Sequence, residues 1–282
     1  MNRNFDLSQL RTFIAVAESS NFGHAAQAVH RTQSAVTQQI QRLEEQLGLP
    51  LFAKHGRYKK ITEHGENLLP YARRIMAIND EAWRTMRNND MVGAVKIGAP
   101  QDVADSILSP LLSKIARYFP QLQIEIHVNR SPVLMDSLLC GEIDLSISTR
   151  TAPQLESVVL RTSPTVWICA ADYSYLKNKP IELVLADEPS LFRKLALTTL
   201  DQHNIPWKIA YVAPHMIGIK AAIKAGLGIT ARSVEFLSPE LRVLSEEQGL
   251  PRLPDVNYYL CMRRDLVSQA IRQVFDAIAT QV

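Results

Sequence analysis

The sequence contains few of the residues that build disulfide frameworks and metal sites. Only three of its 282 residues are cysteines, and Cys140, Cys169 and Cys261 lie far apart along the chain. An odd, widely spaced set of this kind excludes a disulfide framework and a CxxC metal site. Each has apolar neighbours, where a cysteine usually serves as a small core residue, so a redox switch is the less favoured alternative. We therefore expect the protein to remain in a reducing cytoplasm.

Long hydrophobic runs are also missing. No segment approaches the roughly 18 uninterrupted apolar residues of a membrane-spanning helix. The first residues, MNRNFDLSQLRTF, lack the apolar core and the small-residue cleavage site of a signal peptide. We therefore expect no contact with a membrane.

Motifs of the common enzyme classes are absent. The sequence has no GxSxG, no P-loop, no GxGxxG and no HExxH. Its seven histidines are scattered, and none forms a ligand pair with cysteine or aspartate at metal spacing. We expect no catalytic residues, no metal and no cofactor.

The net charge of +3 is distributed unevenly along the chain. Residues 1–62 carry eight Lys and Arg against four Asp and Glu, which gives +4, whereas 63–90 carry −1 and 91–282 are balanced. A small basic module on a larger neutral body indicates contact with a polyanion through that module alone. Because the excess is modest, chance is the alternative interpretation.

Apolar residues at helical spacing predict three helices in the basic module. The predicted helices cover about 7–17, 22–29 and 33–47, and their caps are Asp6, Asn21 and Thr32. In the third helix Val36, Ile40 and Leu43 form an apolar face that can pack on the first two helices. This arrangement is typical of a helix-turn-helix.

The opposite face of the third helix is polar and uncharged. It carries Gln33, Ser34, Thr37, Gln38 and Gln41. The first acid of the helix is Glu44. A helix that enters the major groove needs amides and hydroxyls for the base edges and no carboxylate near the phosphates. We predict that these five residues read DNA bases; a merely solvated face is the less favoured alternative.

A short hairpin with a basic tip follows, and Gly56 supplies its turn. A basic wing beside a recognition helix would contact the sugar–phosphate backbone, which contributes affinity without sequence information. The residues predicted to contact phosphates are Arg31, Lys54, Arg57, Lys59 and Lys60.

The stretch from Leu7 to Gly65 resembles the N-terminal domain of LysR-type transcriptional regulators. The resemblance rests on SSNFGHAAQAV, TQSAVTQQIQRLEEQLGLPLF and ITEHG. It implies that the chain binds double-stranded promoter DNA. Ser34, Thr37 and Lys54 stand where many members have Pro, Ser and Arg, which leaves the base preference open.

A long helix is predicted over residues 63–90, with a narrow apolar stripe. The stripe consists of Leu68, Leu69, Ala72, Ile75, Met76, Ala82, Trp83 and Met86. Such a stripe can form a coiled-coil seam with the same helix of a second chain. The alternative is that it packs on its own chain. In LysR-type regulators this segment is the dimerisation linker, so the resemblance implies a homodimer or a homotetramer.

Strand and helix patterns alternate from residue 91 onward, as in α/β domains with largely parallel sheets. The resemblance implies two subdomains similar to periplasmic solute-binding proteins, at about 91–161 with 264–282 and about 162–263. A small-molecule effector would bind in the cleft between them. The predicted fold is therefore α/β, with a winged helix-turn-helix at 1–62, a linker helix at 63–90 and a two-subdomain effector domain at 91–282.

The predicted effector contacts lie where strands end, since α/β folds bind ligands at the carboxyl ends of strands. They are Gln101, Asp102, Thr149, Arg150, Phe192, Arg193, Thr230 and Arg232. Capping of the following helix is the alternative role for each polar residue.

Segments such as LRTSPTVWICAA and AAIKAGLGITAR resemble the branch of the family that contains LrhA, HexA and PecT. The resemblance implies a regulator of motility, surface behaviour or secreted factors. The alternative is a cytoplasmic small-molecule receptor whose N-terminal module makes protein contacts.

Overall fold

A computed structural model describes residues 4–19, 21–55, 58–87, 94–176, 179–266 and 268–280 of the chain. The chain divides into two compact units, Met1–Gly93 with Ser137–Ile143, and Ala94–Asp136 with Asp144–Val282. Among the helices of the described residues, none is long and apolar enough to cross a bilayer.

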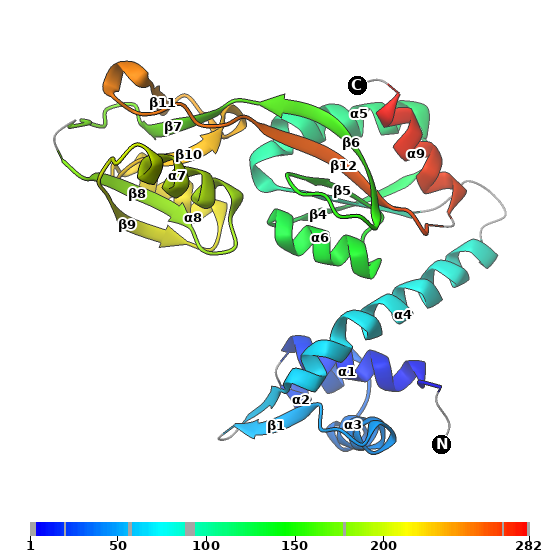
Figure 1. Cartoon of the computed structure of the whole chain (residues 1–282). Helices are drawn as coiled ribbons and strands as arrows, with labels where there is room; N and C mark the ends of the chain where they lie inside the picture. The colour runs from blue at the N-terminus through cyan, green and yellow to red at the C-terminus, as the bar shows by residue number, and fades with distance from the viewer. Residues whose placement is uncertain are drawn as a thin grey trace. The chain divides into compact units, whose positions relative to one another are not determined.

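The first unit contains a winged helix-turn-helix and a long helix (Figure 1). Its elements are α1 (Leu7–Ser19), α2 (Phe22–Ala28), α3 (Gln33–Leu47), β1 (Phe52–His55), β2 (Tyr58–Ile61) and α4 (Glu63–Arg87). β1 and β2 pair antiparallel as the predicted hairpin.

Local hydrogen bonds start these helices where the sequence predicted. The Asn21 side chain accepts a hydrogen bond from the Gly23 N–H at 2.8 Å, and Thr32 accepts one from the Ala35 N–H at 3.2 Å. Each cap satisfies an N–H group that has no partner inside its helix. Asp6 likewise accepts from the Ser8 N–H at 2.7 Å.

One apolar core holds the three short helices and the wing together. Val36, Ile40 and Leu43 of α3 are buried against α1 and α2, as their spacing predicted. The ring of Phe52 in β1 lies 5.7 Å from that of Phe13, which brings the wing into the same core.

The first half of the stripe on α4 packs on its own domain. Ala72 and Met76 are buried in the helix-turn-helix core, and Leu68, Leu69 and Ile75 pack against that core. The prediction that the whole stripe forms a dimer seam was therefore wrong for this half, because α1 lies beside α4 and covers it. Trp83 and Met86, in the second half, are exposed.

The second unit begins with a five-stranded sheet of order β4-β3-β5-β12-β6. Its strands are β3 (Ala94–Ala99), β4 (Gln123–Val128), β5 (Leu145–Ser148), β6 (Leu155–Ser163) and β12 (Val256–Arg263). β3 pairs parallel with both neighbours, and β12 pairs antiparallel with β5 and β6. The helices of this half are α5 (Ser109–Tyr118), α9 (Gln269–Ala279) and the part of α6 (Ser131–Cys140) that precedes Ser137. Of these, α5 and α9 contribute to its core.

The other half repeats this topology. Its elements are β7 (Thr165–Ala170), β8 (Ile181–Ala186), α7 (Leu191–Gln202), β9 (Trp207–Ala213), α8 (Met216–Lys224), β10 (Thr230–Ser233) and β11 (Leu241–Leu244). β10, β7 and β11 form one sheet, and the parallel pair β8 and β9 joins it through a bridge between Leu183 and Ile229. The resulting order, β9-β8-β10-β7-β11, matches that of the first sheet.

The boundary of the second half differs from the predicted 162–263. β12 pairs with β5 and β6, so Val256–Arg263 belongs to the first sheet. β6 and β12 run side by side toward the second sheet (Figure 1). The chain therefore returns from the second half to the first before β12, because a strand belongs to the sheet that satisfies its backbone hydrogen bonds.

Candidate functional site

The polar face of α3 is accessible. Gln33, Ser34, Gln38 and Gln41 are exposed, and Thr37 is half-buried. The Thr37 hydroxyl donates to the Gln33 carbonyl at 2.9 Å, and the Ser34 hydroxyl lies 3.0 Å from that of Thr32. The structure brings all five predicted base-reading residues to one face of one helix, opposite the buried Val36, Ile40 and Leu43.

The first acid of α3 holds the wing. The Glu44 carboxylate accepts the N–H groups of Leu51 at 2.7 Å and Phe52 at 3.0 Å. This contact was missed by sequence reasoning, which recognised only that Glu44 ends the acid-free face. It explains how a carboxylate is tolerated in a helix predicted to approach phosphates.

The basic residues lie on two elements. Arg31 precedes α3 and is exposed, and Lys59 and Lys60 of β2 are exposed. The Lys59 ammonium lies 4.8 Å from the ring centroid of Phe22, which ties β2 to α2. Lys54 belongs to β1, opposite Lys59, but its side chain and the whole of Arg57 lie outside the described residues.

A cavity of about 220 Å³ opens between the two halves of the second unit. Six of the eight predicted effector contacts line it: Gln101, Asp102, Thr149, Arg150, Phe192 and Arg232. They come from the segments that follow β3 and β5, from the first turn of α7, which follows β8, and from β10. Strands from both halves therefore end at this cavity, as α/β topology predicts.

The other two predicted contacts do not line this cavity. The Arg193 guanidinium donates to the Ala186 carbonyl at 3.2 Å and lies 3.2 Å from the Glu188 carboxylate. Thr230 is buried in β10, where it pairs with Ile168. Both predictions of cavity contact were wrong, because Arg193 points back over the preceding loop and Thr230 lies within the sheet.

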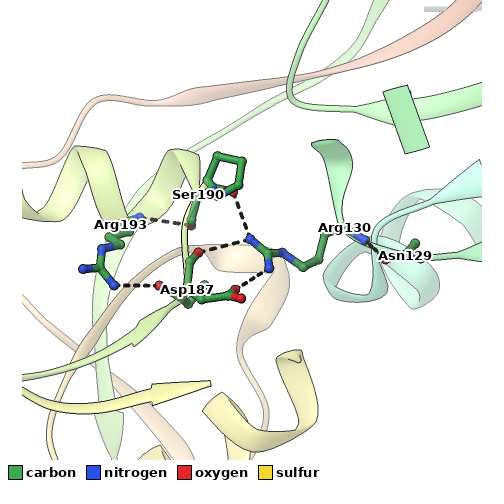
Figure 2. A network of polar contacts seen from close by, with 7 residues as sticks. Asn129, Arg130, Asp187, Ser190 and Arg193 are labelled. Atoms are coloured by element: carbon green, nitrogen blue, oxygen red, sulfur yellow. Dashed lines mark hydrogen bonds and ion pairs between the residues drawn. The ribbon is translucent and has the colours of Figure 1, made fainter. Parts of the chain in front are cut away.

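Arg130 joins the two halves beside the cavity (Figure 2). Its guanidinium pairs with the Asp187 carboxylate and donates to the carbonyls of Asp187 at 3.1 Å and Pro189 at 2.9 Å. Ser190, in the same loop, caps α7 by accepting from the Arg193 N–H. Sequence reasoning missed Arg130, since nothing in its local pattern identifies a partner 57 positions away.

Asp102 and Arg232 form a second, buried connection. Their side chains are 4% and 6% exposed, and the nearest charged atoms are 4.0 Å apart. Burial lowers the pKa of the Arg232 guanidinium, and Asp102 opposes that change. Burial raises the pKa of the Asp102 carboxyl, against the opposing effect of Arg232. Both groups thus lie in an environment that disfavours charge.

Tyr258 completes the cavity wall. Its hydroxyl lies 2.7 Å from that of Ser233, in a buried contact between β12 and β10. Sequence reasoning treated Tyr258 only as part of a strand, because it placed that strand in the other subdomain.

The three cysteines are buried. Burial raises the pKa of the thiols of Cys169 and Cys261. A reactive thiol has a lowered pKa and access to solvent, so these two favour the structural role.

Residues 7–66 match the bacterial regulatory helix-turn-helix domain of the lysR family. Residues 88–282 match the LysR substrate binding domain. The chain belongs to the LysR family. This LysR-family protein is a DNA-binding transcriptional regulator with an effector-binding domain, and its family and relatives are regulators rather than enzymes.

Two relatives extend along nearly the whole LysR-family chain. It is 52% identical over 275 residues to the HTH-type transcriptional regulator PecT of Dickeya dadantii (strain 3937), covering 98% of this chain and 87% of that one. It is 29% identical over 260 residues to the regulator DgdR of Burkholderia cepacia, covering 92% and 88%. These similarities place the protein in the branch that contains PecT.

Solved structures share the fold. The LysR family regulator CbnR superposes with a TM-score of 0.68 at 20% identity, over 97% of this chain and 98% of that one. Full-length CbnR in complex with the target DNA superposes with a TM-score of 0.66 at 20% identity, over 99% of this chain and 100% of that one.

Proposed function

We propose that this regulator binds promoter DNA in the cytoplasm as a homodimer or homotetramer and changes its DNA binding when a small molecule enters the cavity. The genes it controls serve motility, surface behaviour or secreted factors. The observation that carries the proposal is the exposed, uncharged face of α3. Amides and hydroxyls on that face match the donors and acceptors of base edges.

The wing supports this assignment of roles. Lys59 and Lys60 are exposed on β2, which Glu44 fixes to α3 through the backbone of β1. Basic groups held beside a recognition helix favour phosphate contacts that position the helix in the groove. The glutamine-rich face would then discriminate between sequences, while the lysines would bind any duplex.

Exposed apolar residues on α4 support pairing of two chains. Tyr71, Ile78 and Met86 are 68%, 50% and 79% exposed. Tyr71 and Ile78 lie on a different face from Ala72 and Met76, which the domain's own core covers, and Met86 continues the apolar stripe beyond that core. A helix that is apolar on two faces can pack on its own domain and on a partner together. A two-fold dimer would present two α3 helices to a palindromic site.

Contacts between the two halves of the effector domain offer a route for regulation. Arg130 with Asp187, Tyr258 with Ser233, and Asp102 with Arg232 lie at the cavity and join the halves. A ligand that binds one arrangement of the halves more tightly than another shifts the population toward it. The arrangement of the DNA-binding domains in the dimer or tetramer would shift together with the arrangement of these halves.

Genome-wide mapping of bound sites, followed by binding to a recovered promoter fragment across a salt series, tests the proposal. The logarithm of affinity should fall linearly with the logarithm of salt, by about 0.9 for each phosphate contact. Absence of sequence-specific, salt-dependent binding would instead favour a receptor whose N-terminal module contacts proteins.

A further inference from the structure

Arg232 lines the cavity with hydrogen-bond donors that no described residue uses. Its side chain is 6% exposed, and its Nε is buried without a hydrogen-bond partner among the described residues. A guanidinium has five N–H donors, and a buried donor without an acceptor is destabilising. The arrangement therefore favours an acceptor that enters the cavity.

Asp102 does not satisfy these donors. Its carboxylate oxygen approaches Arg232 no closer than 4.0 Å, which is beyond hydrogen-bonding distance. The central carbon of the guanidinium lies over the ring of Phe192, 4.9 Å from the ring centroid. Phe192 thus packs against the guanidinium, while the Nε of Arg232 is left without an acceptor among the described residues.

Two helices begin at the wall of the same cavity. Phe192 lies in the first turn of α7, and Met216 is the first residue of α8. The residue that precedes α8, His215, makes no side-chain capping hydrogen bond. Helix N-termini carry partial positive charge, so both favour an anion in the cavity.

Apolar side chains form much of the rest of the wall, which also includes the polar side chains of Gln101, Arg130 and Arg150. Phe192, Met216 and Ile219 line the cavity beside the polar groups. At about 220 Å³ the cavity is smaller than the roughly 300–1,000 Å³ of sites for drug-sized ligands. The occupant is therefore small, with an anionic group and an apolar part.

We propose that the effector is a small organic carboxylate whose carboxylate group binds Arg232 and whose apolar part packs against Phe192, Met216 and Ile219. This inference rests on the proposed effector function of the cavity. A carboxylate matches the planar donor edge of a guanidinium and forms charge-assisted hydrogen bonds with it.

Calorimetric titration of the full-length protein tests the chemistry. The probes are benzoate, phenylacetate and hexanoate, each compared with its primary amide, and inorganic phosphate. At least one carboxylate should bind with an affinity at least tenfold higher than that of its amide, which has the same shape without the charge. Equal binding of acid and amide, or no binding by any carboxylate, would overturn the proposal. Binding of phosphate alone would also contradict it, since phosphate lacks the apolar part.

Variants test the residue. Arg232→Met should weaken the best carboxylate by about 10- to 100-fold, the effect of losing charge-assisted hydrogen bonds. Asp102→Asn should bind it at least as tightly as the wild type, because the variant removes a buried negative charge that would repel a second carboxylate beside Arg232. Arg252→Met, at an exposed arginine outside the cavity, is the matched control and should have no effect.

The double variant Asp102→Asn with Arg232→Met guards against misfolding, because it leaves no buried charge of this pair unpaired. It should unfold cooperatively and still fail to bind the carboxylate. Retention of carboxylate affinity in this variant, or equal loss in Asp102→Asn and Arg232→Met, would refute the assignment.

Binding of the protein to the promoter fragment without ligand is measured in parallel. If the wild-type protein binds the promoter fragment but no carboxylate, only the proposed effector class is wrong. If the wild-type protein does not bind the promoter fragment, the proposed function itself is wrong.

Discussion

The Glu44 carboxylate and the Leu51 N–H lie 2.7 Å apart, so the C-terminal part of α3 is hydrogen-bonded to the start of the wing. The same carboxylate also accepts the Phe52 N–H. The helix predicted to read bases and the strands predicted to contact phosphates are therefore held in one fixed arrangement. A carboxylate that faces its own backbone donors is also kept away from the phosphates.

Glu44→Ala should loosen this arrangement. Loss of two charge-assisted hydrogen bonds should lower the free energy of unfolding by about 1–3 kcal/mol. Glu44→Gln, which keeps one carbonyl acceptor, should lower the free energy of unfolding by a smaller amount. Urea denaturation of both variants measures the difference, and equal stability of Glu44→Ala and wild type would show that the two bonds contribute nothing net.

Gly65→Ala should destabilise the same domain for a steric reason. A Cβ at this position would lie 2.5 Å from the Leu51 carbonyl oxygen and 2.5 Å from Cγ1 of Ile61. The expected cost is about 1–3 kcal/mol, since α4 must move away from the wing. Asn67→Ala, at an exposed site on the same helix, is the control and should leave the thermal midpoint unchanged or slightly raised.

Thr37→Ala and Lys59→Ala should separate base reading from phosphate binding. Thr37→Ala should relax the preference at one base position by about 1–3 kcal/mol. Lys59→Ala should weaken binding to all DNA sequences alike and reduce the slope of log affinity against log salt by about one. Binding isotherms on the mapped site and on single-base variants measure both. If Lys59→Ala altered discrimination while Thr37→Ala left it intact, the two faces would be wrongly assigned.

Ile78→Glu should dissociate the proposed dimer without unfolding the domain. Ile78 is 50% exposed, so an added charge would be solvated in one chain and buried at a paired interface. Ala72→Glu is the matched contrast, because Ala72 is fully buried in the domain's own core and its replacement should unfold that core. Sedimentation equilibrium and circular dichroism measure the two effects. An Ile78→Glu protein that keeps the wild-type mass would place the interface elsewhere.

The stability of the effector domain should carry a pH dependence from Asp102. Burial raises the pKa of its carboxyl above the ordinary value of 3.8, so the native state binds the proton more tightly than the unfolded state does. The contribution of this group is therefore greatest below about pH 3.8 and declines as the pH rises through the raised pKa. The free energy of unfolding of the wild type minus that of Asp102→Asn, measured between acid and neutral pH, should fall as pH increases. A difference in the free energy of unfolding that does not change with pH would contradict the raised pKa of Asp102.

Much of the N-terminal domain was predictable because its determinants are local. The apolar face of α3 follows from residues three and four apart, and Asn21 and Thr32 cap helices through N–H groups two or three residues away. The uncharged face of α3 is the geometric consequence of the same helical period. Strands such as Ala94–Ala99 were predictable from short apolar runs between turns.

The sequence by itself thus determined the helix-turn-helix, the alternation of strands and helices, and the loops that end at the cavity. The tertiary structure alone decided which surfaces are covered and which distant side chains meet. Packing of α1 on α4 determines which apolar face remains exposed, and pairing with β6 places β12 in the first sheet. Arg130 meets Asp187, and Asp102 meets Arg232, only because the two halves face each other. Local periodicity carries no information on such contacts, which depend on how the chain returns to itself.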